Sequence, residues 1–347
     1  MSQAGRLDHV HGWRGIATLA VVFQHAAQLV REAGHPLFNP LLYAINLGRF
    51  GVVTFFLLSG FVIRFSFRGE TPLRSFAIGR FFRLYPAYWV SLPVLSWVAW
   101  VKGFPPDFKT ILVNATMLQG FFGVYNIGPG YWTLYYEVSF YLFGVVLFLM
   151  GTLRDPRFGG PFALLALGLT LLPFATGAPI SELPFFYALF LIGNLLHDAF
   201  VADSAVAKRW VAVLVPLAMA VGVVMGGVFV PVPNNANVYF KPLALASSMS
   251  VPIAVFVLVL WLKPAMGRTA LYLGTISYSV YLFQDIGLHT LPRLISPRDW
   301  PATYFAGVFV LTLAVAALVV RLVEEPAVAL GKNLARRIGP TSDRVAA

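Results

Sequence analysis

The sequence contains no cysteine among its 347 residues, and only 11% of its residues are charged. Without cysteine there is no disulfide framework, no iron–sulfur or cysteine-ligated metal site, and no covalent thioester on the protein. Soluble globular domains carry charge on about a quarter of their residues, so this chain has too few charges to cover a surface that faces water. With 59% of its residues hydrophobic, it is predicted to be a polytopic membrane protein.

Several motifs of soluble enzymes are also missing. The chain has no Gly-rich phosphate loop, no G-x-S-x-G nucleophile elbow and no dinucleotide fingerprint. No spacing of His and Glu matches a metal site, so we expect no metal. The 25 Lys and Arg residues outnumber the 14 Asp and Glu residues. In a membrane protein such an excess sets topology, so we expect no nucleic-acid partner.

Ten segments are long and apolar enough for a helix that crosses the membrane, which needs about 20 residues. They are Trp13–Val30, Leu47–Phe67, Tyr85–Val101, Tyr131–Met150, Phe162–Thr176, Leu183–Phe200, Trp210–Phe229, Pro242–Leu262, Leu271–Leu291 and Tyr304–Val323. With the N-terminus inside, 18 of the 25 Lys and Arg residues fall on the cytoplasmic side. This bias is typical of ten spans with both termini in the cytoplasm.

The sequence therefore predicts an all-α membrane bundle of about ten transmembrane helices. We expect a single domain over residues 1–347, with its core at about 10–330 and a basic cytoplasmic tail at 331–347. No loop is long enough for an appended soluble domain. The longest, residues 102–130, is expected to form an outside cap or a re-entrant segment packed on the bundle.

Two ionisable residues stand inside the first span, where a charge needs a partner or a function. Arg14 and His25 are 11 residues apart, which on a helix leaves an offset of about 20° and an axial separation of about 16 Å. They therefore share one face, and one groove could run between them. Taken singly, Arg14 could be an anchor that reaches the membrane surface, and His25 could be a packing histidine bonded to a neighbouring helix.

Glu137 is the only acidic residue deep in the fourth span, and we expect it near the depth of His25. A carboxylate beside an imidazole fixes its tautomer and raises its basicity, as general-base catalysis requires. The alternative is a structural carboxylate bonded to tyrosine hydroxyls. Gln284 and Asp285, in the ninth span, are expected at a similar level.

Five arginines surround the inside turn between the second and third spans: Arg64, Arg68, Arg74, Arg80 and Arg83. Arg80 and Arg83 stand at positions i and i+3, on one face of a helix. They would serve topology equally well. A guanidinium also offers a bidentate fork that suits phosphate, so the functional interpretation is a cytoplasmic ligand that bears phosphate groups.

Six short motifs follow one another along the chain. They are Trp13-Arg14-Gly15-Ile16-Ala17 with His25, Gly51-Val52 with the run 55–61, the segment 80–89 with Arg80 and Arg83, Trp132-Thr-Leu134 with Glu137 and Phe140-Tyr141, Ile276-Ser-Tyr-Ser-Val-Tyr-Leu282, and Glu324-Glu325-Pro326. In this order they resemble the integral-membrane acyltransferase 3 family. Members of that family O-acylate sugars and other hydroxyl-bearing molecules with cytoplasmic acyl-CoA.

The resemblance implies a role for each matching residue. His25 would be the catalytic histidine, Arg14 its partner in the same signature, and Glu137 a further site residue. No permanently bound cofactor is implied, and acyl-CoA, most often acetyl-CoA, would be the co-substrate. Its contacts would be Arg80, Arg83 and Tyr88.

The chain departs from the family pattern at three positions. Many members have Asp at the position of His11, an acidic residue at Val53 and His at Gln284. The loss at Gln284 argues against an essential second histidine there.

These observations predict a membrane O-acyltransferase in which His25 acts as general base. The acceptor would be a hydroxyl of a carbohydrate, a lipid-linked glycan or a small hydroxylated molecule, and the expected location is the bacterial inner membrane, among membrane lipids. The alternative is a proton-coupled secondary transporter or flippase with Arg14, His25 and Glu137 as a polar relay. It would require two matching halves, and no internal repeat is visible.

Overall fold

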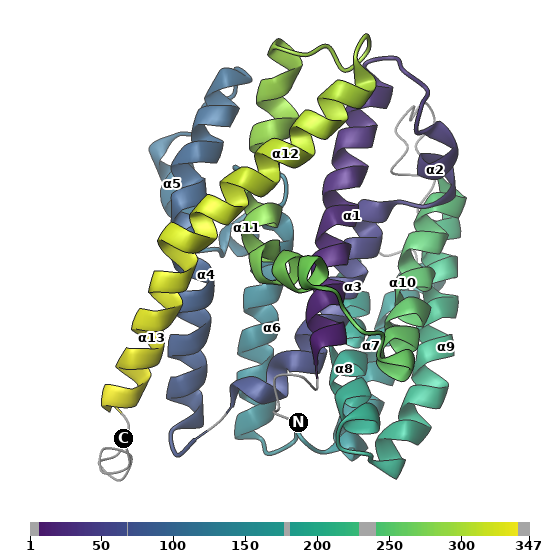
Figure 1. Cartoon of the computed structure of the whole chain (residues 1–347). Helices are drawn as coiled ribbons and strands as arrows, with labels where there is room; N and C mark the ends of the chain where they lie inside the picture. The colour runs from purple at the N-terminus through teal and green to yellow at the C-terminus, as the bar shows by residue number, and fades with distance from the viewer. Residues whose placement is uncertain (1–6, 68, 177–180, 229–240, 339–347) are drawn as a thin grey trace. The chain divides into compact units, whose positions relative to one another are not determined.

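The computed structural model describes residues 7–67, 69–176, 181–228 and 241–338 (Figure 1). Within these ranges the regular structure is helical, and no residue belongs to a β-strand. Several positions used in the topology prediction lie outside the described residues: Arg6, Arg68, Phe229, Arg344 and the tail beyond Ile338. The chain divides into two compact units, each assembled from segments that are distant in sequence.

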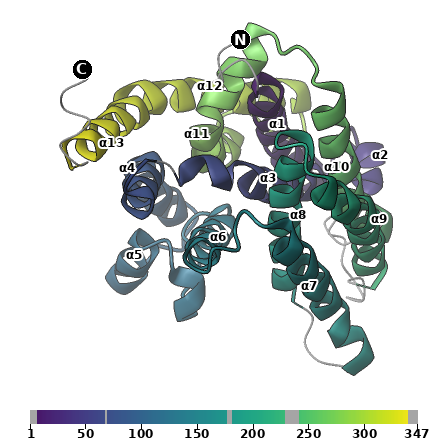
Figure 2. The same ribbon diagram turned by 90° about the horizontal axis from the view of Figure 1, so that it is seen from below.

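The first unit comprises residues 1–62, 146–277 and 295–305. Its main helices are α1 (Asp8–Glu32), the short α2 (Asn39–Ala44), α3 (Leu47–Val62), α7 (Pro156–Thr176), α8 (Leu183–Phe200), α9 (Ala205–Val228) and α10 (Pro242–Leu262). Helix α3 packs against α1, α8 and α10, and α7, α8 and α9 pack against one another (Figures 1 and 2).

Glycines set the close contact between α3 and α8. A Cβ atom on Gly60, within the second sequence motif, would stand 1.8 Å from the carbonyl oxygen of Phe190. A Cβ atom on Gly193 would stand 2.1 Å from the carbonyl oxygen of Leu57. Because backbone atoms cannot move aside as a side chain can, both positions require a residue without Cβ. The second motif therefore serves helix packing.

The second unit comprises residues 63–145, 278–294 and 306–347. It contains η2 (Ile63–Ser66), α4 (Pro72–Val101), α5 (Phe108–Ala115), η3 (Gln119–Phe122), most of α6 (Tyr131–Leu149), the end of α11 (Arg268–Thr290), η5 (Leu291–Arg293), most of α12 (Pro301–Val319), the π-helical η6 (Val320–Glu324) and α13 (Glu325–Ile338). Helix α13 packs along α4 (Figure 2). A Cβ atom on Gly331 would lie 2.7 Å from that of Phe82.

The long segment between α4 and α6 is folded and packs on α4, as expected for either a cap or a re-entrant segment. Asp107 caps the N-terminus of α5 by accepting a hydrogen bond from the backbone of Thr110 at 2.7 Å. Three aromatic side chains of α4 donate hydrogen bonds to carbonyl oxygens at the C-terminal end of α5: Tyr88 to Asn114 (2.7 Å), Trp89 to Ala115 (3.0 Å) and Tyr85 to Thr116 (2.9 Å).

Eight helices among the described residues are long and apolar enough to cross a membrane. The expected number was about ten, and the two extra spans correspond to α1 and α11. These helices, of 25 and 23 residues, are long enough, but polar side chains lower their hydropathy. They carry Arg14, His25, Gln284 and Asp285. The all-α polytopic bundle is confirmed, and α1, one of its most polar long helices, contains two of the candidate site residues, Arg14 and His25.

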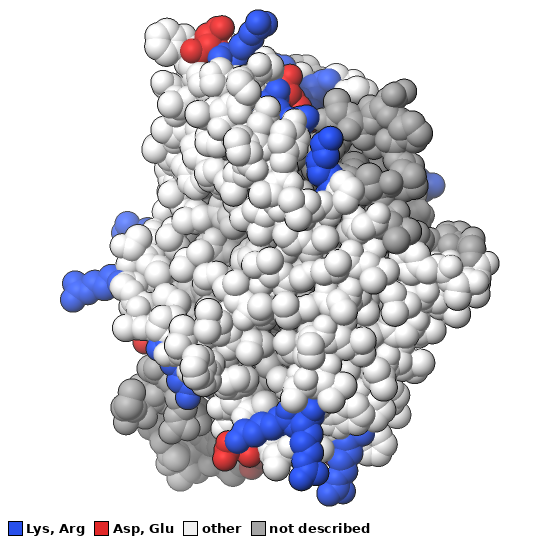
Figure 3. All heavy atoms as spheres, turned by 90° about the vertical axis from the view of Figure 1, so that its right-hand side faces the viewer, with Lys and Arg blue, Asp and Glu red and all other residues white. Residues whose placement is uncertain are grey.

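The distribution of charge on the first unit fits a membrane-spanning bundle. Figure 3 shows the face that α9 and α10 form, and its middle is largely free of charged side chains. Lys, Arg, Asp and Glu gather mainly at the two ends of this face. Such a broad apolar band is expected where helices face lipid.

Candidate active site

Helix α1 holds the two residues on which the functional prediction depends most. It is one uninterrupted α-helix from Asp8 to Glu32, so Arg14 and His25 share a face as predicted, about 16 Å apart along the axis. Both side chains are half-buried. Two ionisable side chains within a membrane helix cost free energy unless other groups of the protein pair with them.

Arg14 is held by the backbone of α11 within the first unit. Its Nη2 donates a hydrogen bond to the carbonyl oxygen of Gly274 at 2.5 Å. The two helices touch here, because a Cβ atom on Gly15 would lie 2.5 Å from the nitrogen of Gly274. His11, which departs from the family pattern, lies 3.2 Å from Thr275 through Nε2 and Oγ1. These contacts favour a role for Arg14 inside the protein over an anchor at the membrane surface.

Arg80 and Glu137 are joined through one tyrosine in the second unit. The Tyr141 hydroxyl donates to Oε1 of Glu137 and accepts from Nη1 of Arg80 at 3.1 Å. Nη2 of Arg80 donates to Oγ of Ser66 at 2.5 Å, and the guanidinium carbon lies 4.6 Å from the centre of the Tyr141 ring. This contact of Glu137 matches the alternative in which it binds a tyrosine hydroxyl. Its pairing with His25 stays a prediction.

Arg83 forms an ion pair that the sequence analysis did not foresee. Its Nη1 lies 2.7 Å from Oε2 of Glu324, whose side chain is only 1% exposed. Glu324 is the last residue of η6, and its other oxygen accepts a hydrogen bond from the Ser279 hydroxyl. The positive charge of Arg83 is therefore balanced inside the second unit.

The serine and tyrosine motif of α11, residues 276–282, forms hydrogen bonds to neighbouring helices. In the second unit, Tyr278 donates to the carbonyl oxygen of Leu84 at 3.0 Å. The Tyr281 hydroxyl lies 3.0 Å from the carbonyl oxygen of Gly130 and 2.8 Å from the Thr133 hydroxyl. This part of α11 is thereby fixed to α4 and to the start of α6. The motif is explained by hydrogen bonding between helices.

The remaining polar candidates have local partners. Tyr88 is fully buried, and its hydroxyl caps α5, so its predicted contact with acyl-CoA stays a prediction. Gln284 is buried and donates to the carbonyl oxygen of Tyr281 at 3.1 Å. Asp285 lies 3.6 Å from Nε2 of His289 through Oδ1.

Sequence reasoning missed Ser66, and it quoted Tyr141 and Glu324 within motifs without assigning them a role in these networks. Tyr141 follows Glu137 by four residues on one helix, a spacing that places two side chains together. That signal was available in the sequence. The pairing of Arg83 with Glu324 spans 241 positions and had no local signal.

In each unit, ionisable groups lie within long helices, and most of the long helices are apolar enough to cross a membrane. This combination defines an integral membrane protein with functional groups inside its helices. The acyltransferase domain family (Acyl_transf_3) matches residues 7–321. The chain belongs to this family, as the six motifs indicated, and it is a membrane acyltransferase. The family assignment supports the enzyme over the alternative of a transporter.

Two curated relatives agree with this assignment. The chain is 32% identical over 152 residues to "Acyltransferase MdmB" of Streptomyces mycarofaciens, a match that covers 40% of this chain and 38% of that protein. It is 24% identical over 370 residues to "Nodulation protein 10" of Rhizobium leguminosarum bv. viciae, covering 93% and 94% of the two chains. No solved structure matches the chain.

Proposed function

We propose that this protein is an O-acetyltransferase that moves an acetyl group from cytoplasmic acetyl-CoA to a hydroxyl of a carbohydrate-type acceptor. The observation that carries the proposal is the placement of His25 and Arg14 on one face of α1 in a member of an acyltransferase family. A half-buried imidazole is the side chain best suited to take a proton near neutral pH.

In the proposed reaction His25 is the general base. It removes the proton from the acceptor hydroxyl while the oxygen attacks the thioester carbonyl. The new carbon–oxygen bond forms, the carbon–sulfur bond breaks, and His25 returns its proton to the departing CoA thiolate. Since the chain has no cysteine, the side chain that is acylated most readily is absent, and direct transfer is the simpler route.

Arg80 is proposed as the main contact for the phosphates of the donor. Its hydrogen-bond partners Ser66 and Tyr141 are neutral hydroxyls, so its charge stays available to an anion. Arg83 faces the Glu324 carboxylate instead. Glu137 acts in this proposal as a positioning residue, because it accepts from Tyr141 and thereby orients the hydroxyl toward Arg80.

Arg80→Gln is expected to raise the KM for acetyl-CoA by about 10- to 100-fold and to leave kcat nearly unchanged, because charge-assisted hydrogen bonds to phosphate are lost. Steady-state kinetics with purified protein measure both constants. Lys208→Gln is the matched control, since Lys208 pairs with the exposed Asp203 in the first unit. An unchanged KM in Arg80→Gln contradicts the assignment.

The activity itself is tested with labelled acetyl-CoA and purified full-length protein in detergent, where no ion gradient exists.

Mass spectrometry of envelope glycans and secreted metabolites, from cells with and without the protein, identifies the acceptor. We expect an acetylated hydroxyl product that depends on the protein. If protein-containing cells hold no such product, the proposed function is wrong.

A further inference from the structure

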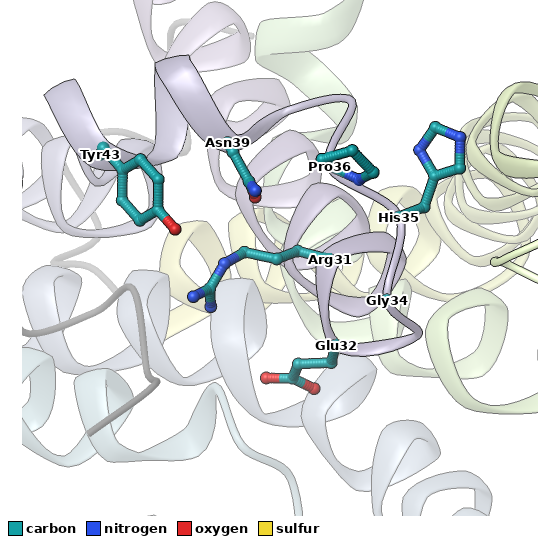
Figure 4. A pocket seen from close by; sticks show the side chains of 7 residues that line it. All are labelled: Arg31, Glu32, Gly34, His35, Pro36, Asn39 and Tyr43. Carbon is teal, nitrogen blue, oxygen red and sulfur yellow. The ribbon is translucent and has the colours of Figure 1, made fainter. Parts of the chain in front are cut away.

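The turn between α1 and α2 forms a pocket that the reaction scheme above does not use. Its volume is about 470 Å³, within the range of small-molecule sites. It belongs to the first unit, and its lining comes from the C-terminal end of α1 and from α2. The lining residues are Arg31, Glu32, Gly34, His35, Pro36, Asn39 and Tyr43 (Figure 4).

The polar side chains of the pocket converge. Figure 4 shows the guanidinium of Arg31, the amide of Asn39 and the hydroxyl end of Tyr43 turned toward one another, whereas His35 points away. The guanidinium carbon of Arg31 lies 5.6 Å from the centre of the Tyr43 ring, and Nζ of Lys241 lies 5.5 Å from it. The pocket thus combines an aromatic ring with the guanidinium of Arg31, and Lys241 contacts the same ring without lining the pocket.

Two acceptor groups balance these donors. Oε1 of Glu32 accepts a hydrogen bond from Nε2 of Gln28 at 2.7 Å, which fixes its carboxylate at the rim. Oδ1 of Asn39 is buried, and no donor among the described residues reaches it. Because this oxygen is closed to solvent, the acceptor that the pocket offers to a ligand is the Glu32 carboxylate.

The pocket is pre-formed because the turn is fixed from several sides. Phe38 packs with Phe23 of α1 and with Phe305, at centroid distances of 5.4 and 5.0 Å. At the other end of α2, the carbonyl oxygen of Ala44 accepts a hydrogen bond from Ser247 at 2.6 Å. Rigid walls reduce the ordering cost of binding.

The pocket and His25 lie on the same helix. Glu32 follows His25 by seven residues, which corresponds to an offset of about 20° and about 10 Å along the axis. Glu32 therefore continues the face that Arg14 and His25 share. A molecule seated against Glu32 lies about two helical turns from the proposed base.

We propose that this pocket binds the acceptor through a pyranose-type ring, an inference that rests on the proposed acetyltransferase function. Glu32 disfavours a simple anion, and Arg31 disfavours a simple cation. Hydroxyl groups both donate and accept, so a polyhydroxylated ring satisfies the Glu32 carboxylate and the Arg31 guanidinium together. The ring of Tyr43 offers an apolar surface to the face of the sugar.

The absence of cysteine makes the pocket directly testable. Single variants Pro36→Cys, in the lining, and Leu37→Cys, next to it and 52% exposed, are purified as full-length protein and labelled with a maleimide. Methyl pyranosides of glucose, galactose, mannose, rhamnose and N-acetylglucosamine are added as competitors. At least one is expected to slow labelling of Pro36→Cys severalfold and to leave Leu37→Cys unchanged. Equal labelling with and without every pyranoside overturns the proposal.

Glu32→Gln tests the same contact by a second route. In the Pro36→Cys background it is expected to weaken protection by the effective pyranoside by about tenfold or more, because a charged hydrogen bond is lost. Glu70→Gln, an exposed carboxylate in the second unit, is the control and should leave protection unchanged. Undiminished protection in Glu32→Gln overturns the binding geometry.

These measurements contain no acetyl-CoA, so they separate the two proposals. Protection without transfer of labelled acetyl retains the sugar site and removes the acetyltransferase function. Transfer without protection retains the enzyme and removes the pocket as its acceptor site.

Discussion

Replacing His25 with alanine is expected to lower the rate of acetyl transfer by about 10²–10⁴-fold, the usual contribution of a general base. Insertion and thermal unfolding of the variant should remain close to those of the wild type, since His25 is only half-buried. The rate is measured with labelled acetyl-CoA and purified protein, and the yield of membrane-inserted protein is measured in parallel.

His25→Gln separates the base from a packing histidine. Glutamine keeps much of the volume and can donate and accept a hydrogen bond, but it cannot take up a proton. A packing role predicts that His25→Gln retains activity, whereas a general base predicts that it is as inactive as His25→Ala. A wild-type rate of acetyl transfer in either variant would contradict the proposed mechanism.

Arg83→Ala is expected to destabilise the protein by about 3–5 kcal/mol, because it leaves the buried carboxylate of Glu324 without its cation. The loss should appear as a lower Tm in detergent. Glu324 is 1% exposed with Arg83 in place, so the guanidinium is the main group that offsets its desolvation. An unchanged Tm would show that the ion pair contributes nothing.

The double variant Arg83→Ala/Glu324→Gln should recover most of that stability, since a neutral amide still accepts the Ser279 hydrogen bond. It also isolates the second predicted role of Arg83. If Arg83 binds donor phosphate, the stable double variant keeps a raised KM for acetyl-CoA. A normal KM limits Arg83 to its structural pair with Glu324.

Helical periodicity predicted the most informative part of the site. The register of Arg14 and His25 depends only on 3.6 residues per turn, and α1 is regular over all 25 residues. Hydropathy predicted the other helices that are long enough to cross a membrane, because a membrane span is a local property of composition. Helices α1 and α11 are long enough to cross a membrane, but their polar side chains lower the mean hydropathy below that of the other spans.

Partners distant in sequence escaped prediction. Glu324 meets Arg83 because α13 and η6 pack along α4, an arrangement that no local pattern encodes. The pocket at the turn between α1 and α2 was missed for another reason. Its residues lie in a turn and in a six-residue helix, α2, too short for periodicity to reveal.

The phase of α13 depends on how many residues precede it. A π-helical turn contains one residue more than an α-helical turn, and each residue of an α-helix advances the side-chain direction by about 100°. Deleting one residue between Val320 and Glu324 would therefore rotate all of α13 by about that angle. Gly331 would turn away from Phe82, and a bulkier side chain would meet that ring. The packing of α13 on α4 therefore depends on the number of residues in η6, as well as on the ion pair that Glu324 forms with Arg83.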